Sequence, residues 1–235
     1  LEEFRDHVLS IEKNPQDLID HVLRPYAESY DVILNASYQS ANNAEVLNQT
    51  LRWLLRIDNR DWVPPAILFL KENKTDVNLL TRFFVALERL AASMFIRRFT
   101  INSRIERYGR LIETIKNNTL WGKDSPLMLT DEEKERTLKV LNEDIYLLNP
   151  KVRNYILLRL DSWLSSAGAI YQHKVITVEH VLPQTIKKGS KWHQDWPDEN
   201  IRNQWVHKLG NLVLLSRRKN SRHKIMTSQK RKQNI

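Results

Sequence analysis

The stretches "ITVEHVLPQ" (residues 176–184) and "LGNLVLLSRRKN" (residues 209–220) decide the fold of the C-terminal part of this chain. The first is short, rich in β-branched residues and stopped by Pro183, and the second contains an apolar run of strand length. Both are therefore predicted to contain strands. Residues 185–200 between them are polar and are expected to form a loop. From about Lys219 the sequence is basic and lacks Gly and Pro, which predicts a helix. The predicted order is strand, long loop, strand, helix.

Glu179 and His180 place a carboxylate beside a base that suits neutral pH, since the histidine pKa is normally near 6.5. Neighbouring side chains on a strand point to opposite faces, so these two share a site only where the strand ends or bends. A hard cation such as Mg²⁺ needs only one or two protein oxygens, which Glu179 and the amide of Asn220 can supply. Asn211 is expected to fix its loop by hydrogen bonding to the backbone of the histidine strand. The pattern favours hydrolysis of a phosphodiester.

The preceding residues predict a bundle of helices. The stretch 76–98 carries an apolar stripe at helical spacing, which is typical of a buried helix. Helix starts are predicted at Asn14-Pro15, at the capping box of Thr130 and Glu133, and at Asn149-Pro150. Near Gly168 the sequence changes from helical patterns to a short run rich in β-branched residues. The sequence therefore predicts a mainly α protein, with a helical domain over 1–168 and a small second domain over 169–235.

Composition narrows the class of protein. Hydrophobic content is 41% and charged content 28%, which is ordinary for a folded soluble chain. No apolar run reaches the length of a membrane span. Cysteine is absent, which excludes disulfides, thiolate zinc sites and cysteine nucleophiles, and which fits a reducing interior. The few glycines form no phosphate-binding loop, so no ATPase is predicted within this chain.

The net charge of +9 is unevenly distributed. Residues 174–235 contain 14 Lys and Arg against 4 Asp and Glu, a net of +10, while residues 1–173 are close to neutral. Tryptophans and leucines are interleaved with these charges, so the segment is expected to fold and to bind a polyanion, most simply nucleic acid. The alternative is a solvated basic face. The candidate DNA contacts are Arg217, Arg218, Lys219 and Arg222, with Lys187, Lys188 and Lys191 in the loop between the strands.

The two motifs together resemble the HNH, or ββα-metal, nuclease superfamily. "EHVLPQ" is similar to its pattern of an acidic residue, His, two hydrophobic residues, Pro and Gln, and Asn211 and Asn220 lie where its two asparagines are expected. Within the superfamily, "VEHVLPQ" with "LGNLVLLSRRKNS" is most similar to the C-terminal nuclease domain of GmrSD-type modification-dependent restriction enzymes. Related phage-defence proteins that sense phosphorothioate DNA carry a similar domain.

This resemblance implies roles for individual residues. Glu179 and Asn220 would be metal ligands, His180 the general base and Asn211 a structural asparagine. It also implies Mg²⁺ or Mn²⁺ as cofactor, double-stranded DNA as substrate, and bacterial defence in the cytoplasm. The longer family members carry an upstream NTPase-like domain, which is expected in the full-length protein. The residues after Asn220 lack the Asn and the Phe that often precede a Lys pair in this family.

Other interpretations stay open. The chain could be a catalytically inactive module that binds nucleic acid or docks a partner, or an RNase with the same fold. Glu179 could form an ion pair with a basic residue, and Asn220 could cap the last helix. A structural zinc site is not favoured, because no two of the nearby histidines have the spacing of four that one helix face requires. These histidines are His173, His193, His207 and His223.

Overall fold

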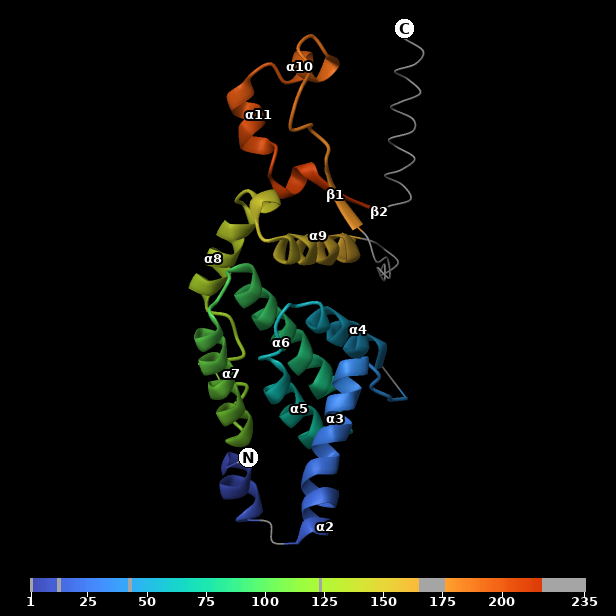
Figure 1. Cartoon of the computed structure of the whole chain (residues 1–235), viewed down its shortest axis with the longest axis vertical. Coiled ribbons are helices and arrows are strands. Elements are labelled where there is room, and N and C mark those ends of the chain that lie inside the picture. Colours follow the sequence, from blue (N-terminus) through green and yellow to red (C-terminus); the bar gives the residue numbers. More distant parts are fainter. Residues whose placement is uncertain (1, 12–13, 42–43, 123, 165–175, 217–235) are drawn as a thin grey trace. The chain divides into compact units, whose positions relative to one another are not determined.

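The computed structural model describes residues 2–11, 14–41, 44–122, 124–164 and 176–216. The chain divides into two compact units, Leu1–Lys134 and Glu135–Ile235. Helices account for most of the described residues, with one two-stranded sheet, so the prediction of a mainly α protein is confirmed (Figure 1). Among the helices in these ranges, none is both long and apolar enough to cross a lipid bilayer.

The first unit is a bundle whose core lies along one long helix, α6. Buried side chains recur along α6 every three or four residues, as the apolar stripe in 76–98 predicts. Helix α4 packs on α6, while α5 packs on α3 and α7 (Figure 1). The helices are α1 (Glu2–Phe4), η1 (Arg5–Leu9), α2 (Pro15–Asp17), η2 (Leu18–Leu23), α3 (Arg24–Asn35), α4 (Ala44–Leu55), α5 (Val63–Glu72), α6 (Val77–Ile96) and α7 (Ile101–Lys116); α8 (Asp131–Leu141) spans the division between the units.

The helix starts follow the capping residues of the sequence. The side chain of Asn14 accepts a hydrogen bond from the backbone N–H of Gln16 at 3.0 Å, at the start of α2. At the start of α8 the backbone N–H of Thr130 donates to the Glu133 carboxylate at 3.0 Å, and the backbone N–H of Glu133 donates to the Thr130 hydroxyl at 3.2 Å. The predicted capping box is therefore confirmed.

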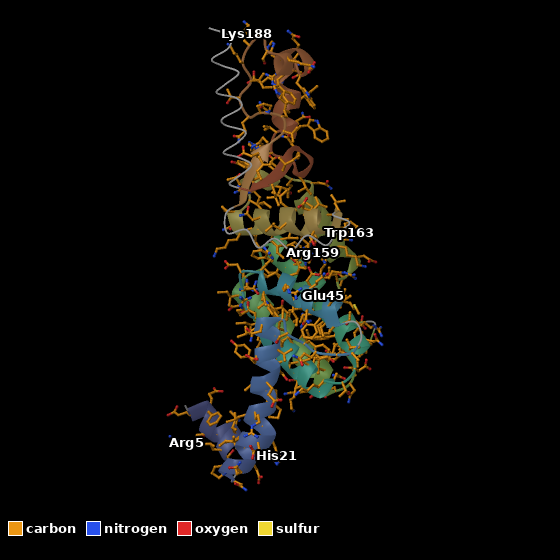
Figure 2. The ribbon with its side chains drawn as sticks, turned by 90° about the vertical axis from the view of Figure 1, so that its right-hand side faces the viewer. Arg5, His21, Glu45, Arg159, Trp163 and Lys188 are labelled. Carbon is orange, nitrogen blue, oxygen red and sulfur yellow. The ribbon has the colours of Figure 1, made fainter. Side chains whose placement is uncertain are left out.

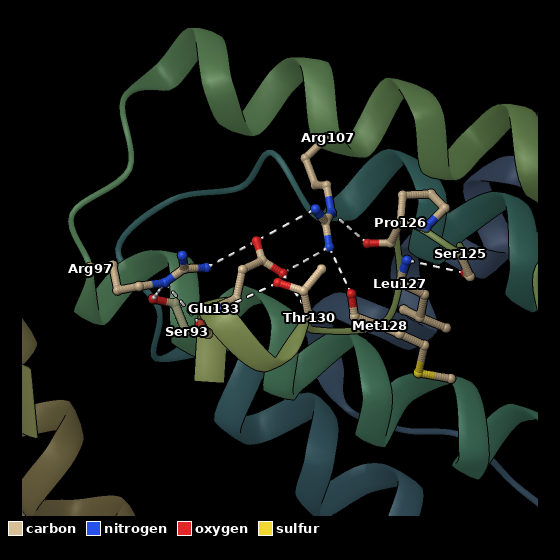
Figure 3. A network of polar contacts seen from close by, with 9 residues as sticks. All are labelled: Ser93, Arg97, Arg107, Ser125, Pro126, Leu127, Met128, Thr130 and Glu133. Carbon is tan, nitrogen blue, oxygen red and sulfur yellow. Dashed lines mark hydrogen bonds and ion pairs between the residues drawn. The ribbon is translucent and has the colours of Figure 1, made fainter. Parts of the chain in front are cut away.

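Glu133 also joins α8 to the two helices that precede it. Its carboxylate lies 3.3 Å from Arg97, at the end of α6, and 3.3 Å from Arg107 on α7. Arg107 further donates to the carbonyls of Pro126 and Met128, at 2.6 Å and 2.8 Å (Figure 3). The side chains of both arginines and of Glu133 are mostly shielded from solvent, so this network stabilises the connection between α7 and α8.

The second unit contains the predicted pair of strands. Its elements are η3 (Ile145–Leu147), α9 (Pro150–Leu164), β1 (Ile176–His180), α10 (Lys191–Asp195), α11 (Glu199–Trp205), η4 (Leu209–Asn211) and β2 (Leu212–Ser216). The strands are antiparallel, with Ile176 opposite Ser216 and His180 opposite Leu212. Helix α9 begins at Pro150 as predicted, and α11 begins at Glu199.

The segment predicted as a loop differs, because it contains the short helix α10. Gly189 has a φ of 79°, a conformation that glycine adopts without strain, and it turns the chain into the helix. The hydroxyl of Ser190 then accepts a hydrogen bond from the backbone N–H of His193 at 3.3 Å. The helix predicted from about Lys219 lies outside the described residues, as does the predicted domain boundary at 168, so both stay predictions.

Candidate active site

The pairing of β1 and β2 determines where the two candidate catalytic residues point. His180, the last residue of β1, is opposite Leu212, and Glu179 is opposite Val213. Directly opposed residues share a face of the sheet, and neighbouring residues on one strand alternate between faces. His180 therefore lies on the face of the buried Leu212, and Glu179 on the face of the half-exposed Val213. The strand ends directly after His180, the position at which the two side chains can approach a shared site.

Three side chains surround the imidazole of His180. Its Nδ1 lies 3.0 Å from the side-chain Nε2 of Gln184, the last residue of the "EHVLPQ" motif. The ring of Tyr146 packs against it with a centroid separation of 4.2 Å and an interplanar angle of 64°. The centroid of the His207 ring lies 5.6 Å from that of His180, with an interplanar angle of 73°. The histidine is thus held by contacts from three separate segments of the second unit.

The electrostatic environment favours neutral His180. Burial lowers its pKa below the usual value, because the charged imidazolium loses solvation. His207 and Arg153 also lower this pKa, while the carboxylate of Glu179 raises it. A neutral imidazole has a lone pair that can accept a proton, which is the form that a general base needs.

Tyr146 is itself fixed from two directions. Its backbone N–H donates to the carbonyl of His207 at 3.1 Å, and its ring stacks on the His207 ring at 5.5 Å and 10°. Arg153 on α9 donates to the carbonyl of Tyr146 at 2.9 Å, and its guanidinium carbon lies 4.7 Å from the centre of the Tyr146 ring. These contacts join α9, the loop after α11 and the end of β1 around His180.

Asn211 connects the loop after α11 to the segment that follows His180. Its side-chain oxygen accepts from the backbone N–H of Leu182 at 2.6 Å, and its amide donates to the carbonyls of Leu182 at 3.1 Å and Val206 at 2.8 Å. The backbone N–H of Val181 donates to the carbonyl of Asn211 at 2.9 Å. Asn211 is buried, so these backbone groups have little access to water. The hydrogen bonds are of the kind expected for a residue that fixes the histidine strand.

A comparison with known protein families gives a match to the part of the chain that contains this site. Residues 130–234 match the GmrSD restriction endonucleases, C-terminal domain. No curated protein and no solved structure is significantly similar to the chain. The resemblance found in the two motifs is therefore confirmed for this segment. The match includes α8 and α9, and it begins close to the division between the two compact units.

Within the GmrSD-like segment, motif analysis found some of the residues around His180 and missed others. Gln184 belongs to the quoted motif, but its contact with the histidine ring was not expected. Tyr146 and Arg153 lie many residues before the "EHVLPQ" motif. Their distance from the motif in the sequence does not indicate that they contact His180. The sequence indicates His207 only as a possible zinc ligand. The GmrSD match begins at residue 130, well before the strands. This start indicates that residues preceding the motif belong to the same domain as His180.

The metal ligands expected for a GmrSD-type nuclease are only partly within the described residues. Glu179 directly precedes His180 at the end of β1, and its carboxylate raises the pKa of His180. Asn220 lies outside the described residues. In the part of the chain that the structure describes, no group of three or more His, Cys, Asp and Glu could hold a metal ion. Mg²⁺ takes as few as one or two protein oxygens, so a carboxylate and an amide have the donor chemistry that it requires.

The predicted DNA contacts also divide into two sets. Lys187, Lys188 and Lys191 are exposed in the segment between the strands. Within the second unit, Lys188 lies at the end away from α9, which carries the labelled Arg159 and Trp163 (Figure 2). The basic set around the second asparagine lies outside the described residues and consists of Arg217, Arg218, Lys219 and Arg222.

Proposed function

We propose that this chain carries a metal-dependent, HNH-type DNA endonuclease that nicks or cleaves double-stranded DNA in bacterial restriction and phage defence. The observation that carries the proposal is the position of His180, at the end of β1 and beside the backbone segment that Asn211 fixes. This arrangement lies in a segment similar to the GmrSD C-terminal domain. The proposal includes cytoplasmic action and an upstream NTPase-like sensor domain in the full-length protein.

In the proposed reaction His180 takes a proton from a water molecule, and the resulting hydroxide attacks the phosphorus of the DNA backbone. The depressed pKa of His180 supports this role, because it keeps the imidazole neutral near physiological pH. Asn211 positions the base by holding the backbone of Leu182, two residues further along. Basic side chains near the site bind phosphates of the DNA backbone.

Glu179 and Asn220 are the residues proposed to hold the divalent cation, Mg²⁺ or Mn²⁺. When bound, such an ion stabilises the negative charge that develops on the phosphoryl group and on the leaving 3′ oxygen. The carboxylate of Glu179 supports the assignment because it is an oxygen donor next to the proposed base.

Two other functions remain as alternatives. A catalytically inactive module that binds nucleic acid or docks a partner would share the basic C-terminal segment. The contacts that hold the His180 ring favour the nuclease, since a binding module does not require them. An RNase with the same fold would have the same site, and the basic segment does not distinguish DNA from RNA.

The experiment is a plasmid-nicking assay with Mg²⁺, with Mn²⁺ and with EDTA, beside an RNA cleavage assay. We expect nicking with either metal and none in EDTA. His180→Ala should lose about a hundredfold or more in rate, because a positioned general base contributes about 10²–10⁴-fold. Circular dichroism and DNA binding of His180→Ala should stay close to those of the wild type.

His193→Ala, in α10, is the matched control and should cleave normally. Near-normal nicking by folded His180→Ala would exclude His180 as the base, and cleavage after exhaustive chelation would exclude the metal. Cleavage of RNA alone would favour the RNase.

A further inference from the structure

The rings of His180 and His207 each contain a buried nitrogen without a hydrogen-bond partner. These atoms are Nε2 of His180 and Nδ1 of His207, and no partner for either is found in the described part of the chain. The two ring centroids are only 5.6 Å apart. Buried polar atoms in proteins are almost always hydrogen-bonded, so two such atoms on adjacent rings require a common explanation.

One shared hydrogen bond would satisfy both atoms. A neutral imidazole has one N–H donor and one nitrogen acceptor, so two neutral histidines can pair without any other group. At this ring separation the nitrogens can interact directly or through one bridging water, which is nearly as favourable.

The contact with Gln184 indicates which nitrogen of His180 carries the proton. The side-chain Nε2 of Gln184 lies 3.0 Å from Nδ1 of His180, and an amide nitrogen can only donate. Nδ1 then accepts, and the proton of the neutral ring is on Nε2. Nε2–H can therefore donate to Nδ1 of His207, while the Nδ1 lone pair of His180 accepts from the exposed Gln184 side chain, which a water molecule can replace.

We propose that His207 is a positioning residue for His180: it accepts a hydrogen bond from Nε2–H, directly or through one water, and so makes Nδ1 the nitrogen that acts as base. This inference rests on the proposed function and deepens it. In the reaction a water molecule replaces the Gln184 amide at Nδ1, an O–H bond of that water breaks, and its proton moves to Nδ1. The hydroxide oxygen bonds to phosphorus while the bond from phosphorus to the 3′ oxygen breaks. The imidazolium keeps its Nε2–H bond to His207, which stabilises the new charge.

The surroundings of His207 fit a positioning role. Its carbonyl accepts from the backbone N–H of Tyr146, and its ring stacks on the ring that also packs against His180. The carbonyl of the preceding Val206 accepts from Asn211, which also binds Leu182 beside the catalytic strand. The two imidazoles are thus held by the same small set of contacts, which limits changes in their separation.

The test compares two substitutions at position 207. His207→Phe keeps a flat ring that can stack on Tyr146 but removes the acceptor, whereas His207→Asn places an acceptor oxygen close to the position of Nδ1. His193→Phe is the matched control in the same unit. Each protein is compared by thermal melting, by single-turnover nicking and DNA affinity, and by ¹⁵N spectra of the histidine side chains, in which loss of a signal in His180→Ala identifies His180.

We expect His207→Phe to nick about tenfold more slowly at saturating DNA, the factor associated with one hydrogen bond, with unchanged affinity for DNA. Its His180 signal should shift from the Nε2-protonated tautomer towards a mixture of both tautomers. His207→Asn should restore most of the rate and the tautomer, and His193→Phe should match the wild type.

An unchanged His180 tautomer in His207→Phe overturns the inference, as does an unchanged nicking rate. If His207→Phe does not fold, the wild type and His207→Asn are compared instead, and a Nδ1-protonated His180 in both overturns it. A wild type that cleaves neither DNA nor RNA would refute the proposed function alone, since the ¹⁵N spectra still report the hydrogen bond.

Discussion

At the scale of single residues, the side chain of Asn211 makes three hydrogen bonds to backbone groups in the second unit. One side chain satisfies a buried backbone N–H and two carbonyls that come from two different segments. Asn211→Ala leaves these groups without partners, so we expect a loss of about 3 kcal/mol in the free energy of unfolding. Urea denaturation followed by tryptophan fluorescence measures this loss.

The controls separate the hydrogen bonds from the change in size. Asn203→Ala, at an exposed position on α11, should change the free energy of unfolding by less than about 0.5 kcal/mol. Asn211→Asp keeps an oxygen that can accept from the backbone N–H of Leu182, but its carboxylate cannot donate to the carbonyls of Leu182 and Val206. It should therefore lower the free energy of unfolding nearly as much as Asn211→Ala does. A fully stable Asn211→Asp would show that the two donated hydrogen bonds contribute little.

At the scale of elements, the Glu133 network makes stability depend on pH. Burial alone raises the pKa of Glu133, but the hydrogen bond from Thr130 and the charges of Arg107 and Arg97 outweigh it, so the pKa is lowered from its usual value of 4.5. A lowered carboxyl pKa gives stability that is complete above pH 4.5 and is lost as the pH falls through the folded-state pKa. Glu133→Gln should therefore have a lower melting temperature than the wild type at pH 7. In acid, the difference between the two melting temperatures should become smaller.

Thermal melting between pH 7 and pH 3 tests this expectation. The loss at pH 7 should be about 1–3 kcal/mol, since two arginines lose their charged partner. Glu135→Gln, at an exposed position two residues further on, should leave the melting curves nearly unchanged at every pH. A constant difference between Glu133→Gln and wild type across this range would mean that the carboxylate charge is not the cause.

Sequence motifs that span a few residues predict individual helices and strands. They do not predict the contacts between segments that lie far apart in the sequence. The capping box of Thr130 and Glu133 and the strand that ends at His180 depend on residues a few positions apart. The helix α10 was missed because five polar and aromatic residues carry no apolar period, and only the Ser190 cap marks its start. The approach of Tyr146 and His207 to His180 is created by folding, so no spacing in the sequence encodes it.

At the scale of the whole molecule, the uneven charge determines where DNA should bind. The net charge of +10 in 174–235 against a nearly neutral remainder predicts that this segment supplies the affinity. Contacts from Lys and Arg to phosphates carry little sequence information, so binding should be nearly independent of DNA sequence. Fluorescence anisotropy with unrelated duplexes of equal length, with and without competing heparin, measures this property.

The salt dependence of the same binding distinguishes two paths for the DNA. Each phosphate contact contributes about −0.9 to the slope of log K against log salt on duplex DNA. Replacing Arg217, Arg218 and Arg222 with Ala should therefore flatten the slope by up to about three units, because these residues flank the proposed metal ligand Asn220. Replacing Lys187, Lys188 and Lys191 serves as the matched triple variant. A slope that changes only in the lysine variant would place the DNA along the exposed segment between the strands, and the arginines would then face solvent.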